Sequence, residues 1–338
     1  MVRAAPRVSI GMPVFNGEKY LKEALDSILA QTYSDFELII SDNASTDRTQ
    51  QICLDYMTKD SRIRYYRNKE NLGASRNFNK VFELSFGEYF KWAAYDDVIA
   101  PEYIQKCISV LNNNPSIVLC HSKTSCIDEN GTIVGDYDHR TLRRVGSLKP
   151  HERFGDLIKI RNPCWSIFGV MRASSLRKTP LHGSYIGADR NLLAEIGLLG
   201  RIYELPEHLF FRRDHQQAYT RRFCAQDLAI NVAKYDEQLA WWKRDSWTYF
   251  PNWKNLFEFL RSIKRVQLKR IERLLCYDQI LRWLIEEGWR FLESDIENLL
   301  MHHSRLGGKL MPAFKAVRLK LEEKIIQIVR ECGYKKKR

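Results

Sequence analysis

The sequence of 338 residues has no apolar run near the ~20 residues that a membrane-spanning helix needs. Its first six residues also lack the long apolar core of a secretory leader. The eight cysteines are scattered, and no two of them form a Cys-x-x-Cys pair, which argues against a zinc site or a redox motif. We therefore expect reduced thiols and a cytoplasmic location.

Two signatures of nucleotide or nucleic acid binding are also missing. The glycines around the first strand pattern, Gly11 and Gly17, do not form Gly-x-Gly-x-x-Gly, which argues against a dinucleotide-dependent dehydrogenase. The net charge of +13 comes mostly from residues 221–338, with 25 Lys and Arg against 15 Asp and Glu. Because acids are interspersed there and no readable motif is present, nucleic acid binding is an alternative that we do not favour.

What the sequence does contain is an alternation of strand and helix patterns. Strand patterns cover residues 7–12, 36–40, 62–66, 88–94 and 117–121, and helix patterns cover 18–31, 46–57, 74–84 and 101–112. The segment 128–131 ends in Asn-Gly, which predicts a hairpin turn. We predict an α/β fold with a Rossmann-like, mostly parallel sheet flanked by helices in residues 1–220, followed by a basic helical region in residues 221–338.

Polar residues stand where three of these strand patterns end, and the carboxyl ends of parallel strands meet at one ligand-binding edge. Asp96 and Asp97 form an adjacent pair that needs a partner to offset desolvation and repulsion. Mn²⁺ or Mg²⁺ carrying a nucleotide diphosphate would supply it, with Asp97 as the better metal ligand and Asp96 near the ribose. The alternative is a helix cap or a solvated turn.

Asp42 ends the second strand pattern, where its carboxylate could accept a hydrogen bond from the imino group of uracil or thymine. The alternative, a cap of the following helix, is equally compatible with the sequence. Trp165 could stack on a sugar ring, although a core position is the more common place for a tryptophan.

Five segments, taken together in order and spacing, resemble the family 2 glycosyltransferases of the GT-A fold. These segments are VSIGMPVFNGE (8–18), ALDSILAQT (24–32), FELIISDNASTD (36–47), NLGASRN (71–77) and GEY (87–89). The resemblance covers residues 7–220. It implies a nucleotide-binding first strand end, and the matching positions are Pro13, Val14, Asn16 and Glu18. It further implies that Asp42 contacts the base, that Arg76 lies near the nucleotide, and that Tyr95-Asp96-Asp97 is the D-x-D element.

The resemblance also implies the residues that act on the acceptor and the diphosphate. Asp189 resembles the catalytic base, which deprotonates the acceptor hydroxyl as it attacks the anomeric carbon with inversion. Many relatives have Glu-Asp here, whereas this chain has Ala188. Arg213 and His215 resemble a segment that pairs with phosphate and completes the metal site. The alternatives are a helix N-cap for Asp189 and a surface basic loop for the other two.

The expected function is transfer of a sugar from a nucleotide-diphosphate donor, with a UDP-sugar favoured, to a carbohydrate or lipid-linked acceptor. Surface polysaccharide or glycoconjugate synthesis is the expected setting, and a catalytically inactive scaffold is an alternative. The basic segment around Arg261, Lys264 and Arg265 offers two interpretations. It could contact the inner face of a membrane, or its charges could be a solvated face whose apolar side packs on the catalytic domain, which we favour.

Overall fold

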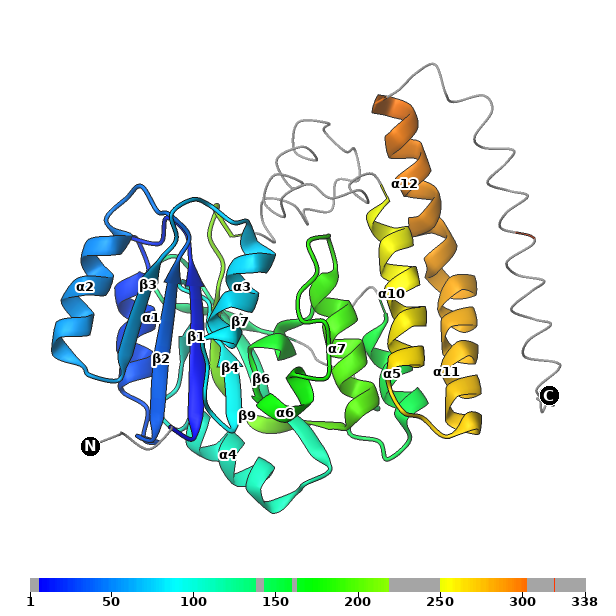
Figure 1. The fold of residues 1–338 in the computed structure, drawn as a ribbon, viewed down its shortest axis with the longest axis horizontal. Helices are drawn as coiled ribbons and strands as arrows, with labels where there is room; N and C mark the ends of the chain where they lie inside the picture. The colour runs from blue at the N-terminus through cyan, green and yellow to red at the C-terminus, as the bar shows by residue number, and fades with distance from the viewer. Residues whose placement is uncertain (1–5, 138–142, 160–162, 219–249, 303–318, 320–338) are drawn as a thin grey trace.

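A parallel sheet forms the first half of the molecule (Figure 1). The computed structural model describes residues 6–137, 143–159, 163–218, 250–302 and 319. Strand β1 (Val8–Val14) lies between β2 (Phe36–Asp42) and β4 (Tyr89–Trp92), and β3 (Ile63–Arg67) pairs with β2. The connecting helices are α1 (Leu21–Leu29), α2 (Thr49–Lys59) and α3 (Ala74–Glu83). All seven elements lie within the predicted segments or within three residues of them. No helix of the described residues is both long and apolar enough to cross a membrane.

Alternation along the strands divides the core into two layers, one on each face of the sheet. Val8, Ile10, Met12 and Val14 of β1 pack in the layer that α1 and α2 cover. Ile39 of β2 points to the opposite layer, with Val81 and Phe82 of α3. Gly11 on that face has no room for a side chain, because a Cβ there would lie 2.6 Å from Val81. The period of two in the strands therefore fixes which helix covers which face.

Beyond β4 the sheet becomes mixed, because β8 (Val170–Arg172) runs antiparallel between β4 and β6 (Ile117–Ile127). The order of the described strands is β3-β2-β1-β4-β8-β6-β9-β5, with β7 on β6. The remaining elements of this half are β5 (Val98–Ile99), α4 (Tyr103–Asn113), β7 (Ile133–Asp136), α5 (Pro150–Leu157), η1 (Trp165–Phe168), α6 (Ala173–Leu176) and α7 (Ala188–Leu199). The α/β prediction is confirmed, with parallel pairing among β1–β4 and between β6 and β9 (Arg201–Arg213), and antiparallel pairing elsewhere.

Strand β9 (Arg201–Arg213) is an element that the sequence patterns did not predict. It runs parallel to β6, and the register shifts around Pro206, where Ser122 pairs with Leu205 and Lys123 with His208. Proline cannot donate to the ladder, so the irregularity lies where proline is tolerated in a strand. The predicted hairpin at 128–131 joins β6 to β7, with Gly131 at φ +84°.

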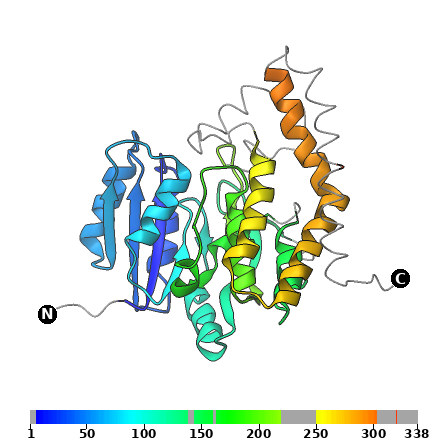
Figure 2. The same cartoon turned by 45° about the vertical axis from the view of Figure 1, so that its right-hand side comes forward.

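The C-terminal helices pack on the second half of the sheet domain, as two views show (Figures 1 and 2). They are α10 (Pro251–Arg265), α11 (Arg270–Trp283), the π-helical turn η2 (Leu284–Gly288) and α12 (Trp289–His302). Phe259 and Ile263 of α10 share a core with Phe154 of α5 and Leu193 of α7. Glu195 of α7 is buried and accepts hydrogen bonds from Arg265 Nη2 at 2.7 Å and Ser262 Oγ at 2.8 Å. The apolar side of α10 is therefore directed inward.

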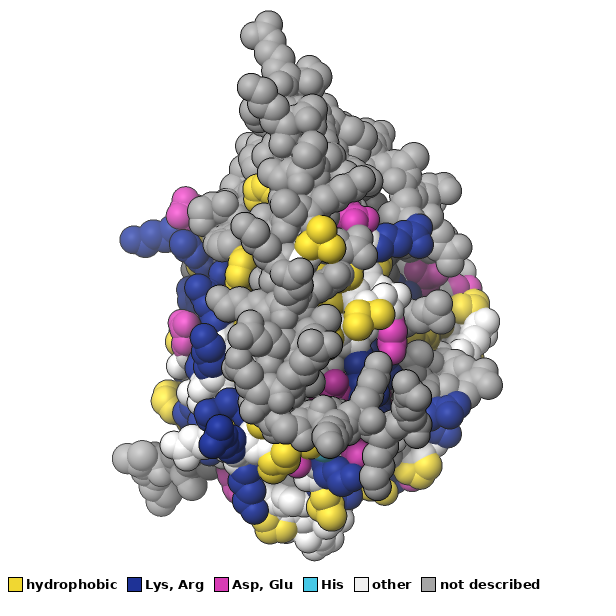
Figure 3. All heavy atoms as spheres, turned by 90° about the vertical axis from the view of Figure 1, so that its right-hand side faces the viewer, with side chains coloured by type: hydrophobic (Ala, Val, Ile, Leu, Met, Phe, Trp, Pro, Cys, Tyr) yellow, Lys and Arg dark blue, Asp and Glu magenta, His cyan; other side chains and the backbone are white. Residues whose placement is uncertain are grey.

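Lys and Arg side chains gather along one edge of the surface seen from the C-terminal side (Figure 3). On α10 itself, Arg261 keeps 58% of its side chain exposed while pairing with Glu258, and Lys264 is exposed as well. These exposed charges support a solvated basic face on α10. The predicted domain boundary near residue 220 lies outside the described residues.

A candidate active site between two walls of carboxylates

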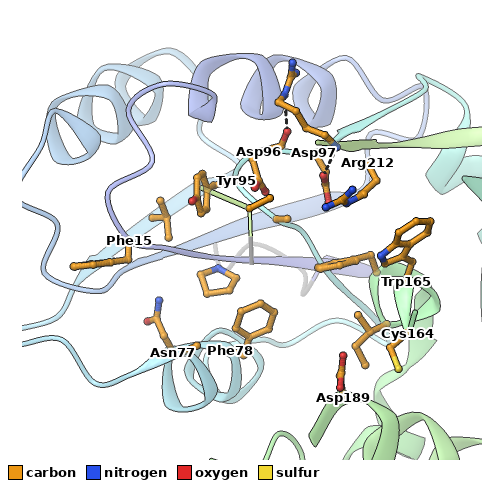
Figure 4. A pocket seen from close by; sticks show the side chains of 18 of the residues that line it. Phe15, Asn77, Phe78, Tyr95, Asp96, Asp97, Cys164, Trp165, Asp189 and Arg212 are labelled. Atoms are coloured by element: carbon orange, nitrogen blue, oxygen red, sulfur yellow. Dashed lines mark hydrogen bonds between the residues drawn. The ribbon is translucent and has the colours of Figure 1, made fainter. Parts of the chain in front are cut away.

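A cavity of about 260 Å³ opens at the carboxyl ends of β1 and β4, and α3, η1, α7 and the end of β9 complete its lining (Figure 4). We call it the cleft. Six of the predicted site residues line it: Pro13, Val14, Asp96, Asp97, Asp189 and Arg213. Asn16, Glu18, Asp42, Arg76 and His215 are not among the lining residues. The sheet and helix α7 therefore bring the D-x-D carboxylates and the predicted base to one cavity, although the other predicted residues lie outside its lining.

Backbone and side chains at the end of β9 hold the acidic pair in place. The Arg213 N–H donates to Asp97 Oδ1 at 2.9 Å, and Arg213 Nε donates to the Asp96 carbonyl at 2.9 Å. His215 Nε2 lies 2.9 Å from Asp96 Oδ2, and its ring packs on Tyr20 at 4.7 Å. His215 thus contacts Asp96 and not Asp97, so in this arrangement it supports the site through the first carboxylate of the pair.

The electrostatic environment of Asp97 disfavours an unpaired negative charge. Burial and then the neighbouring charge of Asp96 raise the pKa of Asp97 to about 8, against the opposing effects of the Arg213 N–H, Arg212 and Lys91. A bound cation would relieve this penalty, and hard carboxylate oxygens suit Mn²⁺ or Mg²⁺. Within the described residues, no group of three His, Cys, Asp or Glu side chains is arranged to hold a metal by itself. The residues fit a cation whose remaining ligands come from a diphosphate or from water.

Asp189 lies on the opposite wall, in the first turn of α7 (Figure 4). The helix N-cap is Gly187, at φ +85°, and no side chain caps it, so the geometry does not support the cap alternative for Asp189. Asp189 Oδ1 accepts the N–H of Arg190 at 2.8 Å. Burial raises the pKa of the nearby Cys164 thiol, and the negative charge of Asp189 adds to this effect. The Asp189 carboxylate lines the cleft and, within the described part of the chain, accepts the bond from the Arg190 N–H and lies near the Cys164 thiol.

Two predicted nucleotide-binding residues instead join the turns that follow β1 and β2. Asn16, at φ 52°, accepts the Thr46 N–H on Oδ1 at 2.9 Å. Glu18 Oε2 accepts the Arg48 N–H at 2.9 Å. These bonds fix the shape of the cleft edge near Pro13 and Phe15.

Asp42 is fully buried, and both of its carboxylate oxygens are already bonded. Oδ1 accepts the Ser45 N–H at 2.8 Å, and Oδ2 accepts the Tyr65 hydroxyl at 2.7 Å. Arg67 Nε lies 3.4 Å from Oδ2. Asp42 therefore holds the turn after β2, and its neighbour Asn43 lines the cleft. On α3, too, the residue that lines the cleft is the one after the predicted residue. Arg76 is exposed, and Asn77 lines the cleft.

Arg213 directs its guanidinium into the protein, so the arginine on β9 that serves the cleft is its neighbour Arg212. The Arg213 side chain is 0% exposed and pairs with Glu23 at 2.6 Å. It also donates to the Asp128 carbonyl at 3.1 Å. Arg212 lies 5.6 Å from the centre of the Trp165 ring, near Asp97 (Figure 4). Trp165 is half-buried and lines the cleft.

The structure adds lining residues that the sequence patterns did not single out: Phe15, Asn43, Asn77, Phe78, His182 and Arg212. Phe15 and Asn77 lie inside the quoted segments, next to residues that were chosen. His182 and Arg212 had no such signal, because the strand that carries Arg212 was not predicted and the loop that carries His182 shows no periodicity.

A sequence model described as "Glycosyl transferase family 2" matches residues 9–178, which is half of the chain. An uncharacterized glycosyltransferase of Methanocaldococcus jannaschii is 37% identical over 134 residues, which are 39% of this chain and 46% of that protein. One of Rickettsia typhi is 42% identical over 119 residues, or 34% and 36% of the two chains. These matches span less than half of each relative. One of Haemophilus influenzae is 26% identical over 302 residues, covering 88% of this chain and 90% of that protein.

Solved structures of low sequence identity share the fold. Staphylococcus aureus TarS in complex with UDP superposes with a TM-score of 0.56 at 16% identity, covering 83% of this chain and 72% of that chain. The mannosyltransferase PcManGT of Pyrobaculum calidifontis, in complex with GDP-Man and Mn²⁺, gives a TM-score of 0.51 at 15% identity, covering 97% and 84%. The predicted GT-A fold is thereby confirmed.

Proposed function

Because this chain belongs to glycosyl transferase family 2, we propose that it transfers a sugar from a nucleotide-diphosphate donor to a hydroxyl group of an acceptor, with inversion. One observation carries the proposal: Asp97 and Asp189 line the same cleft from opposite walls. The complexes of TarS with UDP and UDP-GlcNAc, and of PcManGT with GDP-Man, support a nucleotide-sugar donor.

In the proposed reaction, the Asp189 carboxylate accepts the proton of the acceptor hydroxyl while the hydroxyl oxygen attacks the anomeric carbon. The new glycosidic bond forms as the bond between the sugar and the diphosphate breaks, and the nucleoside diphosphate leaves with the electron pair. A single displacement of this kind inverts the anomeric centre. The position of Asp189 at the start of α7, across the cleft from Asp97, suits an acceptor that enters opposite the diphosphate.

Asp97 would hold Mn²⁺ or Mg²⁺, with Asp96 beside it and His215 orienting Asp96 through the 2.9 Å contact. When bound, such a cation supplies positive charge that stabilises a leaving diphosphate. Arg212 adds a guanidinium on the same wall, and Arg213 keeps both carboxylates in position. PcManGT, whose complex contains Mn²⁺, supports the metal assignment.

We further propose a UDP-sugar donor and a carbohydrate or lipid-linked acceptor, in surface polysaccharide or glycoconjugate synthesis in the cytoplasm. As placed, Asp42 would act on the base indirectly, by holding the turn that presents Asn43. Peripheral membrane contact stays a prediction, since α10 buries its apolar residues against α5 and α7.

Donor turnover tests this function. UDP-, dTDP- and GDP-sugars are incubated with MnCl₂ and a panel of aryl glycoside acceptors, and release of the nucleoside diphosphate is measured. Asp189→Asn should lower turnover at least about 100-fold, because positioned proton transfer alone contributes that much. Asp97→Asn should also lower turnover strongly, because the cation that stabilises the leaving diphosphate would lose its ligand. The control is Asp55→Asn on the exposed side of α2. Wild-type-like turnover by either cleft variant removes that residue's role. Nucleotide binding without turnover by the wild type would favour an inactive scaffold.

A further inference from the structure

Helix α10 of the C-terminal region contacts the segment that carries Asp189, and this contact has no role in the reaction as described so far. Asn255 is buried in the first half of α10. Its Nδ2 atom donates to the Ile186 carbonyl at 2.8 Å and to the Pro251 carbonyl of its own helix at 2.9 Å. Because Ile186 lies just before α7, this bond joins α10 to the turn from which α7 begins.

A second hydrogen bond joins the same residue to the other side of Asp189. The Asn255 carbonyl accepts from Asn191 Nδ2 at 3.3 Å, and Asn191 Nδ2 also donates to the Tyr185 hydroxyl at 3.2 Å. Ile186 precedes Asp189 in the chain and Asn191 follows it. The two bonds to residue 255 therefore bracket the first turn of α7.

The N-cap residue of α7, Gly187, fits closely against Asn255. Its φ of +85° lies in the left-handed region, which glycine adopts without steric cost. A Cβ at this position would lie 2.8 Å from Asn255 Nδ2. The backbone before Asp189 therefore approaches α10 more closely than a residue with a side chain could, and the approach fixes where α7 begins.

These contacts are distinct from those that hold the far end of α10 to α7. Two helical turns beyond Asn255, the buried Ser262 donates through Oγ to Glu195 Oε2 at 2.8 Å. Arg265 pairs with the same carboxylate at 2.7 Å. This second set joins the same two helices but contacts α7 well beyond its first turn. The interface thus offers one bonded contact beside Asp189 and one distant from it.

We propose that Asn255 is a positioning residue, which through its two hydrogen bonds holds the first turn of α7 so that Asp189 is directed toward the acceptor. The inference rests on the proposed function, since it requires Asp189 to be the base. A displacement of about 1 Å at a reacting group can cost about 100-fold in rate. Donor binding should be spared, because the diphosphate wall carries Asp97 and Asn255 lies outside the cleft lining. The C-terminal region then contributes to catalysis as well as to folding.

The test separates turnover from nucleotide binding in the full chain. Asn255→Ala removes the bond to the Ile186 carbonyl, and Asn191→Ala removes the second bond while leaving Asn255 in place. Ser262→Ala is the matched control, because it removes a buried hydrogen bond between the same helices away from Asp189. Turnover is measured as nucleoside diphosphate release from UDP-glucose, UDP-galactose, UDP-GlcNAc or GDP-mannose with MnCl₂ and aryl glycosides. Calorimetry gives the dissociation constants of UDP and GDP, and thermal unfolding gives the melting temperatures.

We expect Asn255→Ala to lower the turnover number at least about tenfold while nucleotide affinity stays within about twofold of wild type. Asn191→Ala should lower turnover less, because the Asn255 side chain still holds the Ile186 carbonyl. Ser262→Ala should lower the melting temperature and keep the wild-type turnover number. Wild-type turnover by folded Asn255→Ala, or an equal loss of turnover in Ser262→Ala, overturns the inference. If Asn255→Ala does not fold, wild-type turnover by Asn191→Ala overturns it, and reduced turnover with intact nucleotide binding supports it.

Failure of the proposed function gives a different result. A wild-type protein that binds none of these nucleotides, or an Asp189→Asn variant with wild-type turnover, overturns that function and this inference with it. Loss of turnover in Asp189→Asn but not in Asn255→Ala overturns the inference alone.

Discussion

The two walls of the cleft differ in how their polar atoms are satisfied. On the wall formed by the β4–β5 turn and the end of β9, Asp96 and Asp97 accept bonds from Arg213, and Asp96 also lies against His215. On the wall formed by η1, α7 and the loop before it, Asp189 accepts an internal bond from its neighbour Arg190, and His182 Nε2 has no partner among the described residues. The protein holds the first wall by bonds to the acidic pair itself, whereas it holds the second through the backbone beside Asp189.

The largest effect on stability is expected from a substitution that removes the hydrogen bonds of the wall that carries Asp96 and Asp97. Arg213→Met should lower the free energy of unfolding by about 3 kcal/mol, because the guanidinium is buried and its donors satisfy carbonyl groups that would be left unpaired. Urea unfolding measures this change. A loss below about 0.5 kcal/mol would mean that Arg213 does not hold the acidic pair in place.

The stability of the protein should depend on pH through His182, which lies on the second wall. The pKa of His182 is about 4 in the folded protein, below its unfolded value of about 6.5. Below pH 6.5 the unfolded state binds the proton first, so stability falls as pH decreases toward 4. Wild type should lose about 2 kcal/mol more than His182→Phe between pH 7 and pH 5 in urea unfolding. Parallel pH profiles of the two proteins would argue against a buried neutral imidazole.

The effect of Asp97 on stability has the opposite dependence on pH. Its pKa of about 8 lies above that of an unfolded aspartate, so stability decreases as pH rises from about 4 to 8. Asp97→Asn keeps an acceptor for the Arg213 N–H and removes the charge. Without added metal at pH 8, it should be more stable than wild type by about 1 kcal/mol or more. Asp189→Asn, on the opposite wall, is the comparison variant and should not show this gain. Equal melting temperatures for all three proteins would contradict the electrostatic penalty at Asp97.

The smallest effect on stability is expected at Arg212, the neighbour of Arg213. Arg212→Met should lower the free energy of unfolding less than Arg213→Met does, because the Arg212 side chain keeps 14% of its surface exposed whereas that of Arg213 is 0% exposed. Donor affinity should nevertheless fall, since Arg212 lines the cleft. The paired comparison with Arg213→Met shows whether adjacent arginines on one strand serve binding and folding separately.

The sequence patterns predicted the parallel half of the sheet well because its strands are continuous apolar runs with clear helices between them. The family resemblance, and not the strand and helix patterns, singled out Asp189, which lines the same cavity as Asp97. The alternation of side chains along the strand could have predicted the position of Asp42 better. Asp42 follows Leu38 and Ile40 with a period of two, which puts it on the face of the sheet that α1 and α2 cover. The structure buries Asp42 on that face. A strand-end position alone does not say which way the side chain points.

Other features could not be predicted because they depend on contacts distant in sequence. Strand β9 is interrupted by Pro206, and its pairing with β6 is a tertiary outcome. The orientations of Arg212 and Arg213 follow from that pairing. His182 is fixed by Ser75 and Asn79, more than one hundred residues earlier, so no local pattern marks it.

The most direct test of the central claim is calorimetric titration of a nucleotide-sugar, with and without Mn²⁺, into wild type, Asp97→Asn and Asp189→Asn. Wild type and Asp189→Asn should bind the donor with Mn²⁺ dependence, and Asp97→Asn should lose that dependence, since Asp97 lies on the diphosphate wall and Asp189 on the opposite wall. Equal, metal-independent affinity in all three proteins would contradict the assignment of the two carboxylates to opposite ends of one donor site.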